Sequence, residues 1–182
     1  WCGGVDAAPA SWCNRRLSRS SSETRAAVIY NPTNFDDLSL LRRRVAAEVR
    51  ATGWRPTVWL ETTPDDPGRS MARRALEAGV DLVMVAGGDG TVRAVSSQLA
   101  GTEMPMALIP AGTGNLLARN LSIPLDTDAA IRLALHGRLT AIDMVTCTFD
   151  DGKERFVVMA GMGLDAQIME STDSGLKKVL RS

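Results

Sequence analysis

Two glycine-rich turns, each directly after a short apolar run, most constrain how this chain can fold. One run begins at Asp81 and leads into Gly87-Gly-Asp-Gly-Thr91, and the other begins at Met106 and leads into Pro110-Ala-Gly-Thr-Gly-Asn115. Short apolar runs are typical of strands buried in a parallel sheet. Glycine turns let backbone N–H groups approach an anion, and a following helix adds a favourable dipole. The stretch from Asp81 to Asn115 therefore predicts a phosphate site at the carboxyl edge of an α/β sheet.

Apolar runs and helical periods alternate along the chain up to about residue 138, which is the pattern of a parallel sheet with right-handed crossovers. The expected strands are 26–30, 56–61, 81–86 and 106–110. The expected helices are 36–52, 67–78, a segment carrying Val92, Val95 and Leu99, then 116–120 and 126–136. Pro67 is expected to begin its helix, Gly53 and Gly79 to follow the ends of two helices, and Asp126 to cap the last one. The predicted fold class is α/β.

Three regions are expected. Residues 1–24 are rich in Ser, Arg, Ala, Gly and Pro without any period, and they predict a disordered leader. Residues 25–138 form the α/β domain. From residue 139 the character changes, because 141–149 and 155–160 resemble a hairpin around the turn signal Asp150-Asp151-Gly152. We expect 139–182 to be an incomplete, β-rich second domain.

Composition and charge disfavour several classes of function. The net charge is zero over 182 residues, so charge gives no argument for nucleic acid as the main partner. The three cysteines have no CxxC spacing, which argues against a disulfide framework and favours a reducing, cytoplasmic setting. No run approaches the roughly 18 apolar residues of a spanning helix. His136 is the only histidine, so histidine metal clusters and histidine-dependent triads are disfavoured.

The first turn places three glycines around one carboxylate. Asp89 could hold Mg²⁺ or accept a proton from an attacking hydroxyl, and Thr91 could donate to a phosphate. The alternative is a tight strand–helix turn in which Asp89 satisfies local N–H groups, and spacing alone leaves both open. No Gly-Lys-Ser/Thr occurs, which excludes a Walker-type loop. Stabilisation of phosphate charge would therefore come from backbone amides, arginine and metal.

Two other features of the sequence give weaker evidence for a function. Gly161-Met-Gly-Leu-Asp-Ala166 matches a dinucleotide fingerprint, but no βαβ unit follows it, so hydride transfer is disfavoured. The arginines at 42, 43, 44 and 50 are expected to form a solvated helix face.

Taken together, Asn31-Pro32, the two glycine turns and residues 161–166 resemble the diacylglycerol kinase catalytic domain family over about residues 26–170. Within that family the motifs resemble those of bacterial soluble lipid kinases, with sphingosine and ceramide kinases more distant. The resemblance implies an α/β nucleotide-binding domain similar to those of NAD kinase and phosphofructokinase. A β-sandwich domain follows it in the family, and the active site is the cleft between the two.

The resemblance also implies a reaction and its residues. The γ-phosphoryl group of ATP would pass to a lipid hydroxyl, such as that of diacylglycerol, with Mg²⁺ neutralising the developing charge. Asp89 is the implied catalytic residue, while the metal ligands stay unknown, with Asp89 one candidate through Mg-ATP. Thr62 is preferred to Thr63 as the contact from the second strand. The implied nucleotide-binding residues are Asn31, Thr62, Gly87, Gly88, Asp89, Gly90, Thr91, Val92, Arg93, Gly112, Thr113, Gly114 and Asn115.

Because the implied substrate lies in a bilayer, peripheral membrane contact is expected. The second-domain segments that supply an acidic base and a Mg²⁺-binding region in bacterial relatives are not expected before Ser182. Exposed strand edges of an incomplete sandwich would favour pairing, which allows a homodimer. A catalytically silent ATP-binding module, an NAD kinase and a protein whose glycine turns have no chemical use stay open. Leu-Leu-Ala-Arg-Asn after the second turn has the lipid-kinase form and argues against an NAD kinase.

Overall fold

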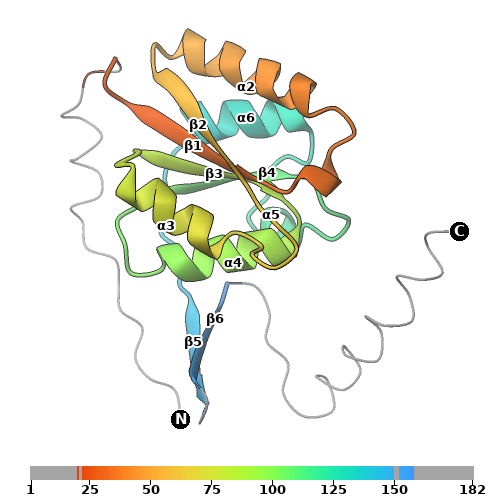
Figure 1. Cartoon of the computed structure of the whole chain (residues 1–182), viewed down its shortest axis with the longest axis vertical. Coiled ribbons are helices and arrows are strands. Elements are labelled where there is room, and N and C mark those ends of the chain that lie inside the picture. Colours follow the sequence, from red (N-terminus) through yellow and green to blue (C-terminus); the bar gives the residue numbers. More distant parts are fainter. Residues whose placement is uncertain (1–19, 21, 150–151, 158–182) are drawn as a thin grey trace, which may run out of the picture.

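A four-stranded parallel sheet lies at the centre of the protein, whose computed structural model describes residues 20, 22–149 and 152–157 (Figure 1). The strands are β1 (Arg25–Tyr30), β2 (Arg55–Glu61), β3 (Leu82–Gly87) and β4 (Met106–Pro110). Their order across the sheet is β2-β1-β3-β4, and every neighbouring pair is parallel. The predicted parallel sheet is therefore confirmed, and all four carboxyl ends meet at one edge.

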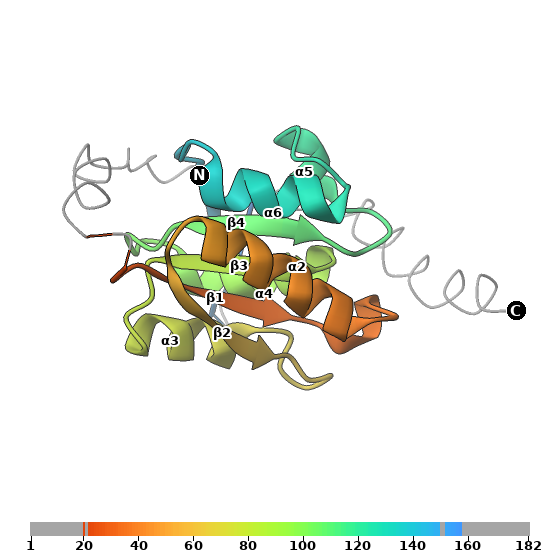
Figure 2. The ribbon, with the colours of Figure 1, turned by 90° about the horizontal axis from the view of Figure 1, so that it is seen from above.

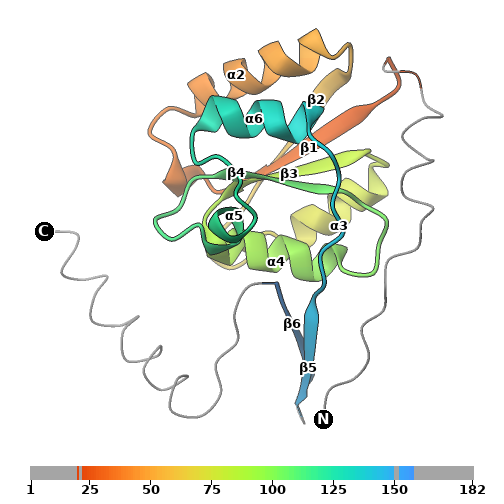
Figure 3. The same ribbon diagram turned by 180° about the vertical axis from the view of Figure 1, so that it is seen from behind.

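Helices cover both faces of this sheet, as the views in Figures 2 and 3 show. On one face lie α2 (Leu38–Ala51) and α6 (Thr127–His136). On the other lie α3 (Arg69–Glu77), α4 (Asp89–Leu99) and the short α5 (Leu116–Asn120). A 3₁₀ turn, η1 (Pro32–Asn34), follows β1. The molecule is thus a three-layer α/β/α arrangement.

The core is divided between the two faces by the alternation of side chains along each strand. In β1, Ala27 and Ile29 pack with the α3 and α4 side, whereas Ala26, Val28 and Tyr30 pack with the α2 and α6 side. Every residue of β3 is buried. This explains why the strands read in the sequence as continuous apolar runs, since a parallel strand covered on both faces has no polar side.

The winding of the chain reverses between β1 and β3. Helix α2 connects β1 to β2 on one face, and α3 then connects β2 to β3 on the other. The N–H of Asn31 donates to the carbonyl of Ala86 across this point, at 3.0 Å. In open α/β sheets, ligands bind in the crevice outside the carboxyl ends of the strands at such a reversal.

Most helix ends follow the predicted signals. Gly53 and Gly79 have φ values of 74° and 62° and come just after α2 and α3. Their left-handed conformation is the usual helix-ending geometry, and it favours glycine. The Asp126 side chain caps α6 by accepting from the N–H of Ala129, at 2.9 Å. Helix α2 begins at Leu38 rather than at 36, because the Asp37 side chain caps it.

The predicted start of α3 at Pro67 is wrong. The helix begins at Arg69, because the carboxylate of Asp66 accepts from the N–H groups of Gly68, Arg69 and Ser70. Hydrogen bonds from Ser70 and the neighbouring backbone lower the pKa of Asp66 to about 2. Asp66 thus accepts hydrogen bonds from the backbone N–H groups at the start of α3, as capping residues do.

The arginines of α2 are only partly a solvated face. The guanidinium of Arg42 lies 4.8 Å from the ring centroid of Trp59 and donates to the Tyr30 hydroxyl at 3.2 Å. The Tyr30 hydroxyl donates in turn to Glu61, at 2.7 Å. Burial raises the pKa of Tyr30, and Glu61 raises it further. Arg44 pairs with Asp128 of α6 at 3.3 Å, which ties the two helices on this face together.

Two further strands, β5 (Val145–Phe149) and β6 (Gly152–Phe156), pair antiparallel and apart from the main sheet. Phe149 pairs with Gly152, so the predicted hairpin is confirmed, although its second strand begins at 152 rather than 155. Arg155 donates to the carbonyl of Ser97 in α4 at 3.2 Å. Whether the hairpin starts a β-rich domain stays a prediction.

The predicted leader, except for residue 20 and residues 22–24, and the 161–166 motif lie outside the described residues. Within the part of the chain that is described, no helix combines the length and apolar character needed to cross a bilayer.

Candidate functional site

The first glycine turn joins β3 to α4. Gly87 ends the strand, Gly88 is the N-cap, and Asp89 is the first residue of the helix. The N–H of Val92 makes the first helical bond, to the carbonyl of Gly88 at 3.1 Å. The N–H groups of the three residues before Val92 therefore have no acceptor within the helix. Together with the helix dipole they favour a bound anion.

The second glycine turn joins β4 to α5 and is held by its own side chains. Asn115 is the N-cap of α5 and has a left-handed backbone, with φ of 49°. Its Oδ1 accepts from the N–H of Gly112 at 2.9 Å, and its Nδ2 donates to the carbonyl of Gly112 at 2.6 Å. Arg119 Nε donates to the carbonyl of Gly114 at 2.9 Å. These bonds fix the shape of the turn.

The two turns are in direct contact. A Cβ atom on Gly112 would lie 2.6 Å from the Cα of Gly88, a separation that real side chains do not reach. Asp89 Oδ1 accepts from the N–H of Leu116, the first residue of α5, at 2.7 Å. Glycine at both positions allows the backbones to meet, and the carboxylate joins α4 to α5.

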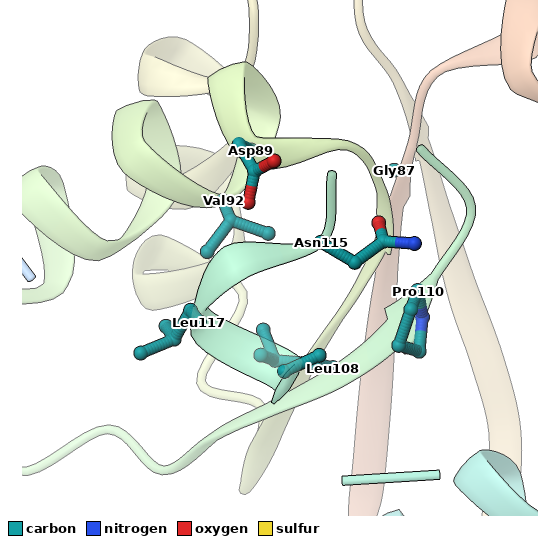
Figure 4. Close-up of a pocket in the computed structure, with 8 residues that line it drawn as sticks. Gly87, Asp89, Val92, Leu108, Pro110, Asn115 and Leu117 are labelled. Atoms are coloured by element: carbon teal, nitrogen blue, oxygen red, sulfur yellow. The ribbon is translucent and has the colours of Figure 1, made fainter. Parts of the chain in front are cut away.

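A small pocket lies beneath this junction, with Asp89 and Asn115 at its polar side and Leu108 and Leu117 at its apolar side (Figure 4). The pocket measures about 10 Å³, which is room for about one water molecule. It is far too small for a nucleotide, so phosphates would have to lie against the outer surface of the turns. The lining residues are Gly87, Asp89, Val92, Leu108, Pro110, Asn115, Leu117 and Ala118.

The structure brings together most of the predicted residues of the two turns. Gly88 meets Gly112, and Asp89 meets Gly114, while Asn115 shares the small pocket with Gly87 and Asp89. The side chains at 91 and 92 are buried, so they could offer a nucleotide only their backbone. Gly90, Arg93, Thr113 and Gly114 are exposed.

Asn31 and Thr62 lie at the carboxyl ends of β1 and β2, and the bonds found for the Asn31 side chain are local. Asn31 Oδ1 accepts from the N–H and hydroxyl of Thr33, so it caps η1. Thr62 is buried at the end of β2, which β1 separates from β3. Thr63 is exposed, and its hydroxyl accepts from the N–H of Asp66 at 3.1 Å. The assignment of these residues to a nucleotide stays a prediction.

The side chains of the two turns could hold a magnesium ion only if phosphate oxygens were also bound to that ion. Among the described residues, no three His, Cys, Asp or Glu side chains gather closely enough to hold a metal. Asp89 is the only acidic residue in the two turns, and its Oδ1 is used by Leu116. Its Oδ2 remains as a single carboxylate ligand, and Mg²⁺ is commonly bound by one or two carboxylates plus substrate phosphates.

Sequence reasoning missed two groups that shape the site. One is the N–H of Leu116, which no side-chain motif reveals. The other is Arg119, which follows Asn115 by four residues and so lies on the same side of the short helix. That spacing could have indicated a joint role in holding the second turn.

Comparison with known proteins agrees with this geometry. The family model for the diacylglycerol kinase catalytic domain matches residues 25–147. A probable lipid kinase YegS-like protein of Pseudomonas fluorescens is 37% identical over 140 residues, which cover 75% of this chain and 45% of that relative. A diacylglycerol kinase of Mycobacterium tuberculosis is 38% identical over 102 residues, covering 55% of this chain and 33% of the relative.

A solved structure shares the fold. The crystal structure of a diacylglycerol kinase from Bacillus anthracis matches with a TM-score of 0.56 and 29% identity, covering 66% of this chain and 44% of that one. The predicted NAD kinase-like fold class is thereby confirmed. In each of these matches the chain spans less than half the length of the relative. With its parallel sheet and its matched catalytic-domain region, the chain belongs to the diacylglycerol kinase catalytic domain family.

Proposed function

We propose that the protein is a lipid kinase that transfers the γ-phosphoryl group of ATP to a lipid hydroxyl, such as that of diacylglycerol. Membership of the family and the kinase names of the relatives support phosphoryl transfer. One observation carries the proposal: two glycine turns meet at the carboxyl edge of the sheet around a single carboxylate, Asp89. Phosphoryl transfer depends chiefly on positioning and charge stabilisation, which such an arrangement supplies.

The backbone at the start of α4 would bind the phosphates of ATP. The N–H groups of residues 89–91 have no acceptor within the helix, and Gly90 has open space where a side chain would be. Arg93 is exposed one turn along the same helix and would add positive charge. Mg²⁺ bound with ATP would neutralise charge on the phosphates. Thr113 and Gly114, which are exposed, would form the opposite wall together with Gly112.

The two oxygens of the Asp89 carboxylate would have different roles, since one is held by a hydrogen bond and the other is left for the reaction. Oδ1 is held by the N–H of Leu116, and Oδ2 lies over Gly114. In the transfer, the lipid oxygen bonds to the γ-phosphorus as the bond to the bridging oxygen breaks, and ADP leaves with the electron pair. The hydroxyl proton must pass to a base. Asp89 Oδ2 would accept that proton or serve as the one protein ligand to Mg-ATP.

The test is transfer of radiolabel from γ-labelled ATP to diacylglycerol in mixed micelles, compared between the native protein and Asp89→Asn. We expect the substitution to lower the rate by about 100-fold or more, because it removes the negative charge at the reacting centre. Glu77→Gln serves as the matched control, since Glu77 is exposed at the far end of α3. Unchanged activity and ATP affinity in Asp89→Asn would contradict the proposal.

The same assay separates the alternatives. ATP binding without transfer to any lipid hydroxyl would indicate a silent nucleotide-binding module. Transfer to NAD but not to lipid would indicate an NAD kinase, which shares the Gly-Gly-Asp-Gly-Thr turn. Peripheral membrane contact, a cytoplasmic location and a homodimer belong to the proposal as well. Co-sedimentation with vesicles that contain diacylglycerol and analytical ultracentrifugation would test membrane contact and dimerisation.

A further inference from the structure

Both polar atoms of the Asn115 side chain make hydrogen bonds within the protein. Its two polar atoms both bond to Gly112, at 2.9 Å and 2.6 Å, and only 9% of the residue is exposed. The left-handed backbone at Asn115 is a conformation that asparagine tolerates better than most residues. An amide that is bonded through both polar atoms and is nine-tenths buried presents little surface to a nucleotide, although the sequence places Asn115 among the nucleotide-binding residues.

Arg119 holds the other side of the same turn. Its Nε donates to the carbonyl of Gly114 at 2.9 Å, reaching back from the last turn of α5. Asn115 and Arg119 thus fix the two ends of the Gly112–Gly114 segment. Two of the three residues in this segment are glycines, which restrict the backbone little, so its shape depends on such bonds.

The fixed turn determines where the carboxylate of Asp89 lies. Leu116 follows Asn115 directly, and its N–H donates to Asp89 Oδ1 at 2.7 Å. Gly114 lies under the other oxygen, close enough that a Cβ atom there would be 2.7 Å from Oδ2. One oxygen of the carboxylate is therefore bonded to the residue that directly follows Asn115, and the other lies against the segment that Asn115 and Arg119 hold. Any shift of that segment moves the donor and the surface against which Asp89 rests.

We propose that Asn115 and Arg119 are positioning residues for Asp89, and that neither side chain contacts the nucleotide. The kinetic effect of this role rests on the proposed function. The link between Asn115 and Asp89 can be measured without activity. A displacement of about 1 Å at a reacting group can cost about 100-fold in rate, so holding Asp89 in place matters for turnover.

Three substitutions isolate the role of these side chains. Asn115→Gly keeps the left-handed backbone accessible and removes both bonds to Gly112. Arg119→Ala removes the bond to Gly114, and Arg119→Lys keeps a long cationic donor that can still reach that carbonyl. The matched controls are Asn120→Ala and Arg74→Ala, since both residues are exposed and lie on helices outside the turn.

The kinetic arm uses γ-labelled ATP and diacylglycerol. We expect Asn115→Gly and Arg119→Ala to lower kcat by about 10-fold to 100-fold, with a smaller change in KM for ATP. Arg119→Lys should recover most of the loss, and the controls should match the native protein. A raised KM with unchanged kcat would mean that these side chains bind nucleotide directly, which would overturn the inference.

The structural arm follows exchange of the Leu116 amide hydrogen by NMR and needs no turnover. Loss of the bonds between Asn115 and Gly112 should speed exchange of the Leu116 amide by about 10-fold or more. Asp89→Ala should have the same effect, because it removes the acceptor of that amide. Native exchange in Asn115→Gly, with fast exchange in Asp89→Ala, would overturn the inference. If the native protein phosphorylates no lipid, the proposed function fails, and this arm still decides the link between Asn115 and Asp89.

Discussion

The carboxylate of Asp89 rests on the backbone of Gly114. Its Oδ2 lies 2.7 Å from the position that a Cβ atom on Gly114 would take, and its Oδ1 accepts from Leu116 two residues further on. Two loops that are 25 residues apart in the chain, counted from 89 to 114, thus share one carboxylate. The absence of a side chain at 114 is what leaves room for it.

Gly114→Ala should therefore damage activity more than folding. The new methyl group would push the carboxylate away, because Asp89 is the flexible partner, and we expect a fall of about 10-fold or more in the rate of lipid phosphorylation. The free energy of unfolding should change by about 1 kcal/mol or less, since Gly114 is exposed. Steady-state kinetics and urea denaturation measure the two effects.

A double substitution checks the cause of that loss. If Gly114→Ala acts through the carboxylate, it should add almost nothing in an Asp89→Asn background. Fully additive losses in the double variant would contradict the displacement of Asp89.

Gly90→Ala should separate stability from nucleotide binding. Gly90 lies in the first turn of α4, and a Cβ atom there would meet nothing within 4 Å. Alanine should stabilise the fold by about 0.5 kcal/mol, because it restricts the unfolded chain and favours the helix. The same methyl group would occupy the surface expected to receive phosphate, so ATP should bind about 10-fold more weakly. Thermal denaturation and calorimetric titration test both, and unchanged ATP affinity would count against phosphate at this position.

Gly68→Ala should destabilise the fold. Gly68 has φ of 137°, and a Cβ atom there would lie 2.7 Å from Cγ2 of Val95 in α4. The strained backbone and the clash should together cost about 2 kcal/mol or more of unfolding free energy, measured by urea denaturation. Adding Val95→Ala would remove the clash and leave the backbone strain, so it should not restore stability. Full recovery in that double variant would show that packing alone demands glycine here.

Asp66 should make the fold sensitive to acid. Its pKa is lowered to about 2 by hydrogen bonds from Ser70 and the adjacent backbone. A carboxyl whose pKa is lower in the folded state stabilises that state above its unfolded pKa of about 3.9. The contribution is lost as the pH falls from about 4 to about 2. Asp66→Asn should flatten the decline of unfolding free energy over that interval, and an unchanged pH profile would contradict the role of Asp66 as a charged cap.

Local chemistry in the sequence was sufficient for most of the fold. Short apolar runs such as 82–87 predict strands buried on both faces, and their alternation with helical periods predicts a parallel sheet. Gly53 and Gly79 mark helix ends because a left-handed residue is needed there. The start of α3 was misplaced because proline is acceptable at a helix start, whereas the carboxylate of Asp66 determines which N–H groups are capped.

The glycine turns were predicted as a phosphate site from their glycines and from their position between an apolar strand and a helix, since glycine permits close approach of any backbone. Their contact with each other was not readable from the sequence. It arises because parallel pairing of β3 with β4 sets Gly88 against Gly112. Only that tertiary arrangement gives the Asp89 carboxylate its hydrogen bond from Leu116, and only there can Asn115 hold the turn on which Asp89 rests. Residue types determine which chemistry is available, while the register of the sheet decides which groups meet.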